Sequence, residues 1–437
     1  MMKKSFLIAL LCAALSLLAA AQSQPAKRES APEIRQEAFD IVWRTVKEKH
    51  FDPTFGGVDW DKVRQEYAPR VAAVRSDGEL YSLLQQMLGE LRQSHFNIIP
   101  PEAIIEDDVK EPPTGGVGID LQIIDGAAMI TRVEPGSAAE RAGLRPGFII
   151  KEVDGASVEQ VKGRFVRSKE SPAMTRLRLT RIIAARIGGK PGTQVRLAYL
   201  DKYGRRHIAT LLREKLKGEL SPPFGNFPPQ YTEFEAKRLA DGTGYIRFNV
   251  FVVSLTERIR AAIRSMADAP GLIIDLRGNP GGIGGMASGI AGLLSDKQTS
   301  LGRMTMRSGY VNFAVFPQKD PYTGPVVILI DGGSASTSEV FSGGMQEIGR
   351  AVVVGERSMG AALPSVIQKL PTGARFQFAI ADFKTPRGVL IEGRGVIPDV
   401  EVKLTRRSLL AGRDLQLEAA LEQVKRQTPQ KASVKAR

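Results

Sequence analysis

Short, mainly apolar runs recur at residues 244–248, 272–276 and 326–330, with segments of helical length between them. Runs that are apolar at nearly every position, rather than at alternate positions, predict strands buried on both faces. Helices are expected at residues 259–266, 286–294 and 337–348. Strands that alternate with helices in this way predict an α/β sheet covered on its faces.

The chain of 437 residues is too long for a single hydrophobic core, so several domains are expected. Apolar residues at helical spacing predict an N-terminal helical domain at 33–100, and short strands with glycine turns occupy 113–216. The α/β core is assigned to 225–405, and residues 406–437 to a C-terminal helix and a basic tail. The predicted fold class is therefore α/β multidomain.

The first 21 residues have the pattern of a secretory signal peptide. Lys3 and Lys4 precede an apolar run at 6–18, and three alanines follow at 19–21. An uncleaved membrane anchor is the alternative. The only cysteine, Cys12, lies inside this segment, so the remainder has no thiol for a disulfide or a zinc cluster. We predict an exported protein, periplasmic or extracellular, without metal or cofactor.

The formal net charge of +14 could favour nucleic acid or an anionic lipid surface. The basic residues are densest at 162–186 and after residue 406. Because no nucleic-acid-binding motif accompanies them, a solvated basic face is the simpler interpretation. We therefore expect no nucleic-acid partner, and association with a membrane surface through these patches stays open.

The strand-rich region carries three adjacent short motifs, at 135–139, 142–144 and 146–150. Together they resemble a PDZ domain of the bacterial protease kind. The resemblance implies a module that binds an extended chain end as an added strand and holds its carboxylate on loop amides. The arginine-rich segment 161–192 is expected to be a helix inserted into this module.

The peptide-binding loop of this PDZ-like domain would be formed by Gly116, Val117, Gly118 and Ile119. A glycine-rich turn that enters a strand is equally what an ordinary hairpin needs, so a purely structural role remains the alternative.

Ser336 lies just after a predicted buried strand and just before a predicted helix. At this position a hydroxyl projects from the sheet edge, where helix N-terminal amides stabilise negative charge, as a nucleophile requires. The alternative is structural, because Ser336 and Glu339 also fit a capping box.

A glycine turn at 278–282 follows another central strand. The amide of Gly281 or Gly282 could join that of Thr337 as a two-donor oxyanion hole. A dinucleotide-binding turn at 282–287 is a weaker alternative, because no acidic residue ends the following strand. Asp275 and Arg277 are expected to brace this turn rather than to contact substrate.

Four segments together resemble the C-terminal processing, or tail-specific, serine peptidases. They are Asp275–Gly282, Ser334–Glu339, Lys384–Gly388 and Glu392–Asp399. The resemblance implies a crotonase-like α/β catalytic core and places the nucleophile on Ser336.

One position departs from the serine-lysine members of that family. Ala361 stands where their general-base lysine lies, and an alanine cannot accept a proton. The tricorn branch instead uses a histidine preceded by a serine and a late glutamate, and His95, Ser94 and Glu392 match those places. The resemblance thus implies a Ser-His-Ser-Glu tetrad.

Each tetrad member also has a simpler interpretation. His95 could be an ordinary core histidine, and Glu392 could pair with Arg394 or Arg387 at the surface. Glu356 is the rival acid. The other two histidines, His50 and His207, lie in charged stretches and are expected at the surface, and Lys369 and Lys384 lie outside the matching turn.

These features predict a serine endopeptidase that hydrolyses polypeptides that are unfolded or expose their tails. Two alternatives are a catalytically inactive PDZ scaffold that binds peptides, consistent with Ala361, and a binder of hydrophobic small ligands, since the same core resembles that of a retinoid-binding protein. The oligomeric state is not predicted.

Overall fold

The computed structural model of the chain describes residues 29–101, 114–163, 172–223 and 229–428. The predicted signal peptide at 1–21, with Cys12, and the end of the basic tail lie outside the described residues. Within the described part, no helix combines the length and the apolar character needed to cross a membrane.

From residue 29 onward, the described N-terminal part contains three α-helices, α2 (Pro32–Lys49), α3 (Trp60–Val71) and α4 (Asp77–Gly89). Side chains of Asp59 and Ser76 accept backbone amides at the starts of α3 and α4, as N-caps do. The apolar faces of the helices pack together, as the sequence periodicity predicted.

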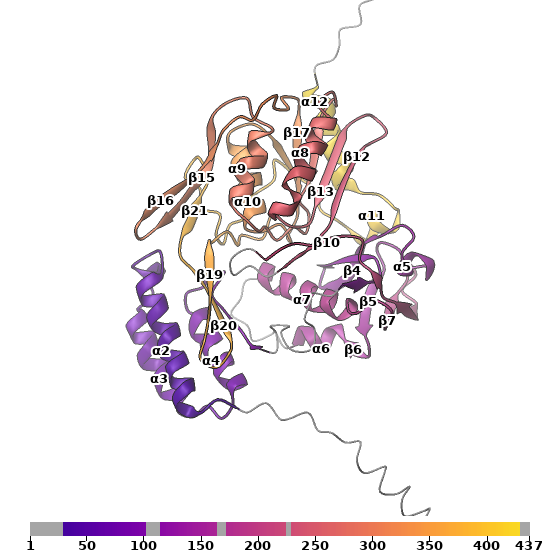
Figure 1. Cartoon of the computed structure of the whole chain (residues 1–437). Helices are drawn as coiled ribbons and strands as arrows, with labels where there is room; N and C mark the ends of the chain where they lie inside the picture. Colours follow the sequence, from indigo (N-terminus) through magenta and orange to yellow (C-terminus); the bar gives the residue numbers. More distant parts are fainter. Residues whose placement is uncertain (1–28, 102–113, 164–171, 224–228, 429–437) are drawn as a thin grey trace, which may run out of the picture.

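The strand that follows these helices is paired with a distant part of the chain. β1 (Asn97–Ile99) joins β20 (Arg375–Ala379) and β19 (Ser365–Lys369) in an antiparallel sheet of order β1-β20-β19. Phe376 and Phe378 of β20 are buried in the same hydrophobic cluster as α2, α3 and α4. Figure 1 shows this hairpin lying against the N-terminal helices. The helical domain is therefore anchored to the C-terminal part of the chain through β20.

The expectation that His50 lies at the surface is wrong. Its side chain is fully buried, its ring stacks on Phe51 and Phe96, and its two nitrogens bond to the Gln93 side chain and the Asp52 carbonyl. The charged neighbours of His50 face solvent on α2, but the chain turns inward where that helix ends. His207 is exposed and pairs with Asp201, as expected.

The middle domain is a β-sheet with three helices. The strand order is β3-β4-β5-β7-β8, with β6 (Ala156–Ser157) paired to β5. The strands are β3 (Ile119–Ile124), β4 (Ala127–Val133), β5 (Ile149–Val153), β7 (Gln194–Leu200) and β8 (Arg206–Leu212), and the helices are α5 (Ala138–Arg141), α6 (Val158–Gly163) and α7 (Pro172–Ile187). The predicted inserted helix is α7, which packs next to β3.

Four short strands connect the middle domain to its neighbours. β2 (Gly115–Gly116) pairs with β9 (Glu214–Lys215), and β10 (Glu219–Leu220) pairs with β11 (Tyr231–Thr232).

The core domain is built on a six-stranded sheet of order β12-β13-β14-β17-β18-β22, parallel except for β12 at one edge. Its strands are β12 (Phe234–Arg238), β13 (Gly244–Phe248), β14 (Leu272–Asp275), β17 (Val326–Ile330), β18 (Val352–Gly355) and β22 (Val400–Glu401). The three apolar runs of the sequence are its central strands, as predicted.

Helices cover both faces of this sheet. One face carries α8 (Thr256–Ser265), α9 (Gly285–Gly292) and α10 (Thr337–Glu347), and the other carries α12 (Leu415–Gln427). Beside them, β15 (Thr299–Met306), β16 (Gly309–Val315) and β21 (Asp382–Lys384) form a separate sheet, and α11 (Arg406–Leu410) leads into α12 (Figure 1). The loops that leave the carboxyl ends of β14 and β17 meet at one edge, where ligands bind in such sheets.

Replacing Phe376 by alanine should destabilise the chain by about 3–5 kcal/mol, because this fully buried ring fills the cluster shared by the helical domain and β20. The measurement is the midpoint of urea unfolding. Val366→Ala is the matched control, since Val366 lies on the adjacent strand and is 37% exposed. Equal stability of the two variants would contradict the anchoring role of β20.

Candidate active site

Ser336 lies between β17 and α10 and has an unusual backbone conformation. Its φ of 52° and ψ of −117° lie outside the regions that non-glycine residues favour. Such strain persists only where surrounding contacts hold it, and it is common at catalytic serines on strand-to-helix turns. The residue is half-buried, so its hydroxyl is accessible.

The carboxylate of Glu339 holds the strained backbone of Ser336 in place. It accepts the amide of Ser336 at 3.0 Å, the hydroxyl of Ser358 at 2.5 Å, and the amides of Gly360 and Ala361 at 2.7 and 3.0 Å. Burial raises the pKa of Glu339 to about 7, although these four donors act to lower it. Ser336 is the N-cap of α10, as the capping-box interpretation predicted, and the same Glu339 carboxylate also holds the 358–361 turn. The structural role is therefore compatible with a role as nucleophile.

The glycine turn lies directly against Ser336. A Cβ added to Gly281 would lie 2.7 Å from the amide nitrogen of Thr337 and 2.8 Å from the Cβ of Ser336. The hydroxyl of Thr337 donates to the carbonyl of Gly282 at 2.9 Å. Only glycine permits this approach, as the positive φ values of Gly281 and Gly282 also require.

The expectation for Gly281 as an oxyanion donor is wrong in this conformation. Its amide donates to the side chain of Asn279 at 2.9 Å, and Asn279 is itself buried and donates to the carbonyl of Phe248. Among the contacts of the described residues, no hydrogen bond uses the amides of Gly282 or Thr337. These two amides are the candidate oxyanion donors.

Asp275 and Arg277 lie behind the turn. Two guanidinium nitrogens of Arg277 donate to Asp275 at 2.9 and 2.6 Å, Tyr245 donates to the same carboxylate, and Asp414 bonds to Arg277 from the start of α12. Burial acts to raise the pKa of Asp275, but the Arg277 guanidinium outweighs it and holds that pKa well below its usual range. This arrangement fits the bracing role predicted for the pair.

Ser94, His95 and Glu392 lie together, although 298 residues separate Ser94 from Glu392. The amide and the hydroxyl of Ser94 contact the Glu392 carboxylate at 2.6 and 2.9 Å, and the hydroxyl lies 2.7 Å from Nδ1 of His95. His95 has a φ of 62°, a second strained non-glycine residue. The pairing of β1 with β20 brings this segment to the core.

The hydrogen bonds of Ser94 determine the tautomer of His95. An ionised Glu392 only accepts, so the single hydroxyl proton of Ser94 is donated to it. Nδ1 of His95 must then carry the proton that bonds to the Ser94 oxygen, which leaves Nε2 with a free lone pair. Nε2 is therefore the atom able to act as a base.

A single peptide group connects this trio to Ser336. The carbonyl of Ala361 accepts the amide of Ser336 at 3.0 Å, and the amide of Ala362, on the other side of that peptide bond, donates to Glu392 at 3.2 Å. The structure thus brings Ser336, Ser94, His95 and Glu392 to one place. Among the described contacts, no hydrogen bond joins His95 to Ser336.

Burial and, as a smaller effect, the nearby cation Arg181 together lower the pKa of His95 to about 4. The half-buried imidazole is consequently neutral at physiological pH, as a general base must be. Burial raises the pKa of Glu392, an effect that its bonds to Ser94 partly offset.

The rival site residues lie elsewhere or have other partners. Glu356 accepts the amide of Leu404 at 2.7 Å, and Lys384 pairs with Asp382 on β21. Lys369 is exposed on β19. In the described part of the chain, no ion pair joins Glu392 to an arginine. Glu392 is therefore the acid on Ser94.

The predicted peptide-binding loop is held firmly in the PDZ-like domain. Gly116 pairs with Glu214, and the carbonyls of Val117 and Gly118 accept the amides of Ala139 and Glu134.

Ile119 then begins β3 at the edge of the sheet, and the φ of Gly118 is 78°. A strand edge beside a rigid loop suits strand addition, and it also suits a plain hairpin.

Sequence reasoning missed the contact between α7 and the site. Leu179, Ile183 and Ile187 of α7 pack into the PDZ-like core. Ala173, Met174 and Leu177, which lie on another face, pack against Ala335, Met359 and Ala361 beside Ser336. The signal in the sequence was this second apolar stripe, offset from the first.

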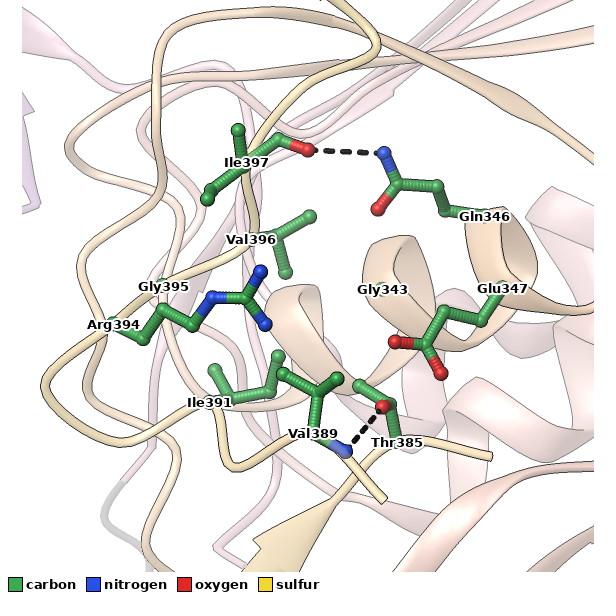
Figure 2. A pocket seen from close by; sticks show the side chains of 10 residues that line it. All are labelled: Gly343, Gln346, Glu347, Thr385, Val389, Ile391, Arg394, Gly395, Val396 and Ile397. Carbon is green, nitrogen blue, oxygen red and sulfur yellow. Dashed lines mark hydrogen bonds between the residues drawn. The ribbon is translucent and has the colours of Figure 1, made fainter. Parts of the chain in front are cut away.

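A small pocket of about 60 Å³ lies beside the C-terminal half of α10 (Figure 2). Its lining includes Gly343, Gln346 and Arg394 and none of the four tetrad candidates. This volume is far below the size of sites for lipid-like ligands. The pocket gives no support to the interpretation as a hydrophobic-ligand binder.

Glu339→Gln should slow the reaction of Ser336 with a fluorophosphonate probe at least about tenfold, because the amide side chain leaves buried donors of the 358–361 turn without an acceptor. Labelling rate is the readout. Glu347→Gln, at the other end of α10, is the control. Labelling of the Glu339 variant at the wild-type rate would exclude this positioning role.

Comparisons with known proteins agree with this geometry. Residues 242–402 match peptidase family S41, residues 31–89 match the tricorn protease C1 domain, and residues 108–180 match the PDZ domain. A carboxyl-terminal-processing protease of Synechocystis sp. is 27% identical over 391 residues, which cover 87% of this chain and 84% of that protein.

Two solved structures show the same fold. The photosystem II D1 C-terminal processing protease has a TM-score of 0.58 and 23% identity, over 84% of this chain and 93% of that one. The tricorn protease has a TM-score of 0.52 and 17% identity, over 92% of this chain and 38% of that one. Residues 242–402 therefore form a peptidase family S41 core, accompanied by a tricorn C1 region and a PDZ domain, and the chain is a serine-type peptidase.

Proposed function

We propose that the chain is an exported serine endopeptidase in which Ser336 is the nucleophile and His95 the general base, with Ser94 and Glu392 orienting His95. The observation that carries the proposal is the hydrogen-bond series from His95 through Ser94, Glu392 and the 361–362 peptide group to the amide of Ser336. Four segments that are separate in the sequence, at 94–95, 336, 361–362 and 392, converge in it.

In this mechanism Nε2 of His95 takes the hydroxyl proton as the Ser336 oxygen attacks the peptide carbonyl. The amides of Gly282 and Thr337 stabilise the negative charge on the carbonyl oxygen. His95 then gives the proton to the leaving amine, and a water molecule repeats the sequence to release the acyl group. The imidazole and the hydroxyl must approach within hydrogen-bond reach for this, a contact that often forms only with substrate bound.

The substrates would be polypeptides that are unfolded or expose a chain end. The PDZ domain supports this, since such modules bind an extended terminus. Relatives named carboxyl-terminal-processing proteases support it as well. Export rests on the pattern of residues 1–21.

Ser336→Ala should abolish cleavage of casein, with a loss of about a thousandfold or more, because the neighbouring hydroxyls of Ser334, Thr337 and Ser338 each donate to a backbone carbonyl and cannot replace it. His95→Gln should have a comparable effect, and Lys369→Ala should have none. Casein digestion and fluorophosphonate labelling are the measurements. Retained cleavage by the Ser336 variant would overturn the assignment, and an intact protein that neither cleaves nor takes the probe would fit the inactive peptide-binding scaffold.

On the acidic side, kcat/KM should begin to decline only at an unusually low pH. Because the pKa of His95 is lowered to about 4, the imidazole stays unprotonated as pH falls, and kcat/KM should hold from pH 7 down to about 5 before it declines. Burial raises the pKa of Glu392, so protonation of this carboxylate also contributes to the decline at low pH. A profile that falls near pH 6.5 would contradict a buried neutral base.

A further inference from the structure

Arg181 is a cation placed beside the proposed base without an acidic partner. In the part of the chain that the structure describes, the charged group that acts on it is a second cation, Arg178. The buried Arg277, by contrast, bonds to both Asp275 and Asp414. Burial lowers the pKa of the Arg181 guanidinium, but the residue as a whole is exposed, so another molecule can reach it.

The phase of α7 explains why Arg181 is near the site. Met174, Leu177, Arg178 and Arg181 are spaced by three and four residues and therefore lie on one face of the helix. Met174 and Leu177 pack on the residues beside Ser336. Arg178 donates to the side chain of Asn97, two residues after His95, at 2.8 Å. Arg181 lies on the next turn of the same face, near enough to His95 for its charge to act on the imidazole.

An unpaired cation at this position works against the reaction. His95 becomes an imidazolium when it takes the Ser336 proton, and Arg181 disfavours that charge. The cost is removed if a carboxylate pairs with Arg181 while the reaction proceeds. His95 also protonates the leaving amine, so a group beside His95 faces the residues that follow the scissile bond.

From these observations we infer that a substrate carboxylate on the leaving-group side supplies the counter-ion of Arg181 and thereby favours the charged state of His95 during cleavage. The carboxylate can come from an Asp or Glu side chain or from the free C-terminus of the substrate. The inference rests on the proposed function and deepens it by naming the substrate class.

Because the benefit arises when His95 is charged, it should appear in kcat and not only in KM. Wild-type enzyme should cleave a peptide with a carboxylate just after the scissile bond about tenfold better than its neutral counterpart, the scale of one charge pair in a partly shielded site. This preference should weaken as salt is added.

The experiment compares four fluorogenic peptides of one sequence with the wild-type protein. In the first pair, the residue just after the scissile bond is Asp in one peptide and Asn in the other, and both peptides end in an amide. In the second pair, both peptides carry Asn and end close to the scissile bond, one in a free carboxylate and the other in an amide. The first pair tests an acidic side chain, and the second tests the chain terminus. A preference in either pair supports the inference and identifies the source.

Arg181→Gln should remove the preference and raise cleavage of the neutral peptides, since the repulsion on His95 is gone. Arg181→Lys should retain it. Arg186→Gln, an exposed arginine on another face of α7, is the matched control and should behave as wild type. Loss of activity towards all peptides alike in Arg181→Gln would indicate a structural role and overturn the inference.

Failure of this inference and failure of the proposed function give different results. Cleavage that requires Ser336 but shows no dependence on carboxylate in either pair would overturn this inference alone. Absence of cleavage of every peptide and of casein by the wild-type protein would overturn the proposed function and this inference with it.

Discussion

The buried carboxylate of Glu339 is the contact on which the arrangement of the site depends. It accepts hydrogen bonds from Ser336 and from three donors of the 358–361 turn, so it fixes the position of the hydroxyl relative to that turn. A carboxylate with no solvent access is tolerated only when its oxygens are fully bonded. The strained backbone of Ser336 is held by the same contacts.

The turn that lacks a lysine still organises the site through its backbone. Ala361 has no group that could accept a proton, yet the peptide bond after it contacts Ser336 on one side and Glu392 on the other. The base function is proposed to lie on His95, which arrives from the N-terminal domain. The turn therefore connects Ser336 to Glu392 through its backbone and not through a side chain.

The sequence predicted the core strands because residues 272–275 and 326–330 are apolar throughout, a pattern that few other structures produce. It could not place Ser94 next to Glu392 by periodicity or spacing, since the contact spans 298 residues, and that expectation came from resemblance. His50 was misplaced because its charged neighbours dominate the local pattern, although its own ring points inward.

Other details of the site were beyond the reach of sequence because they depend on side-chain packing. The amide of Gly281 is occupied by Asn279, which a residue pattern does not reveal. The arginines of α7 looked like a solvated basic face, and only the fold shows that Arg181 lies beside His95. The helical periodicity could have distinguished the two apolar stripes of α7, but it could not have shown which part of the structure each stripe packs against.

The pairing of β1 with β20 has a consequence for the order of events during synthesis. The segment that carries His95 is complete early, but the strand that holds it in place begins only at Arg375, and Glu392 comes later still. Most of the chain must therefore be synthesised before the proposed base His95 and the hydroxyl of Ser336 can be brought together. With His95 as the proposed base, a chain truncated before Arg375 would lack the contacts that position it and could not cleave its surroundings, because both ends of the chain contribute to the proposed site.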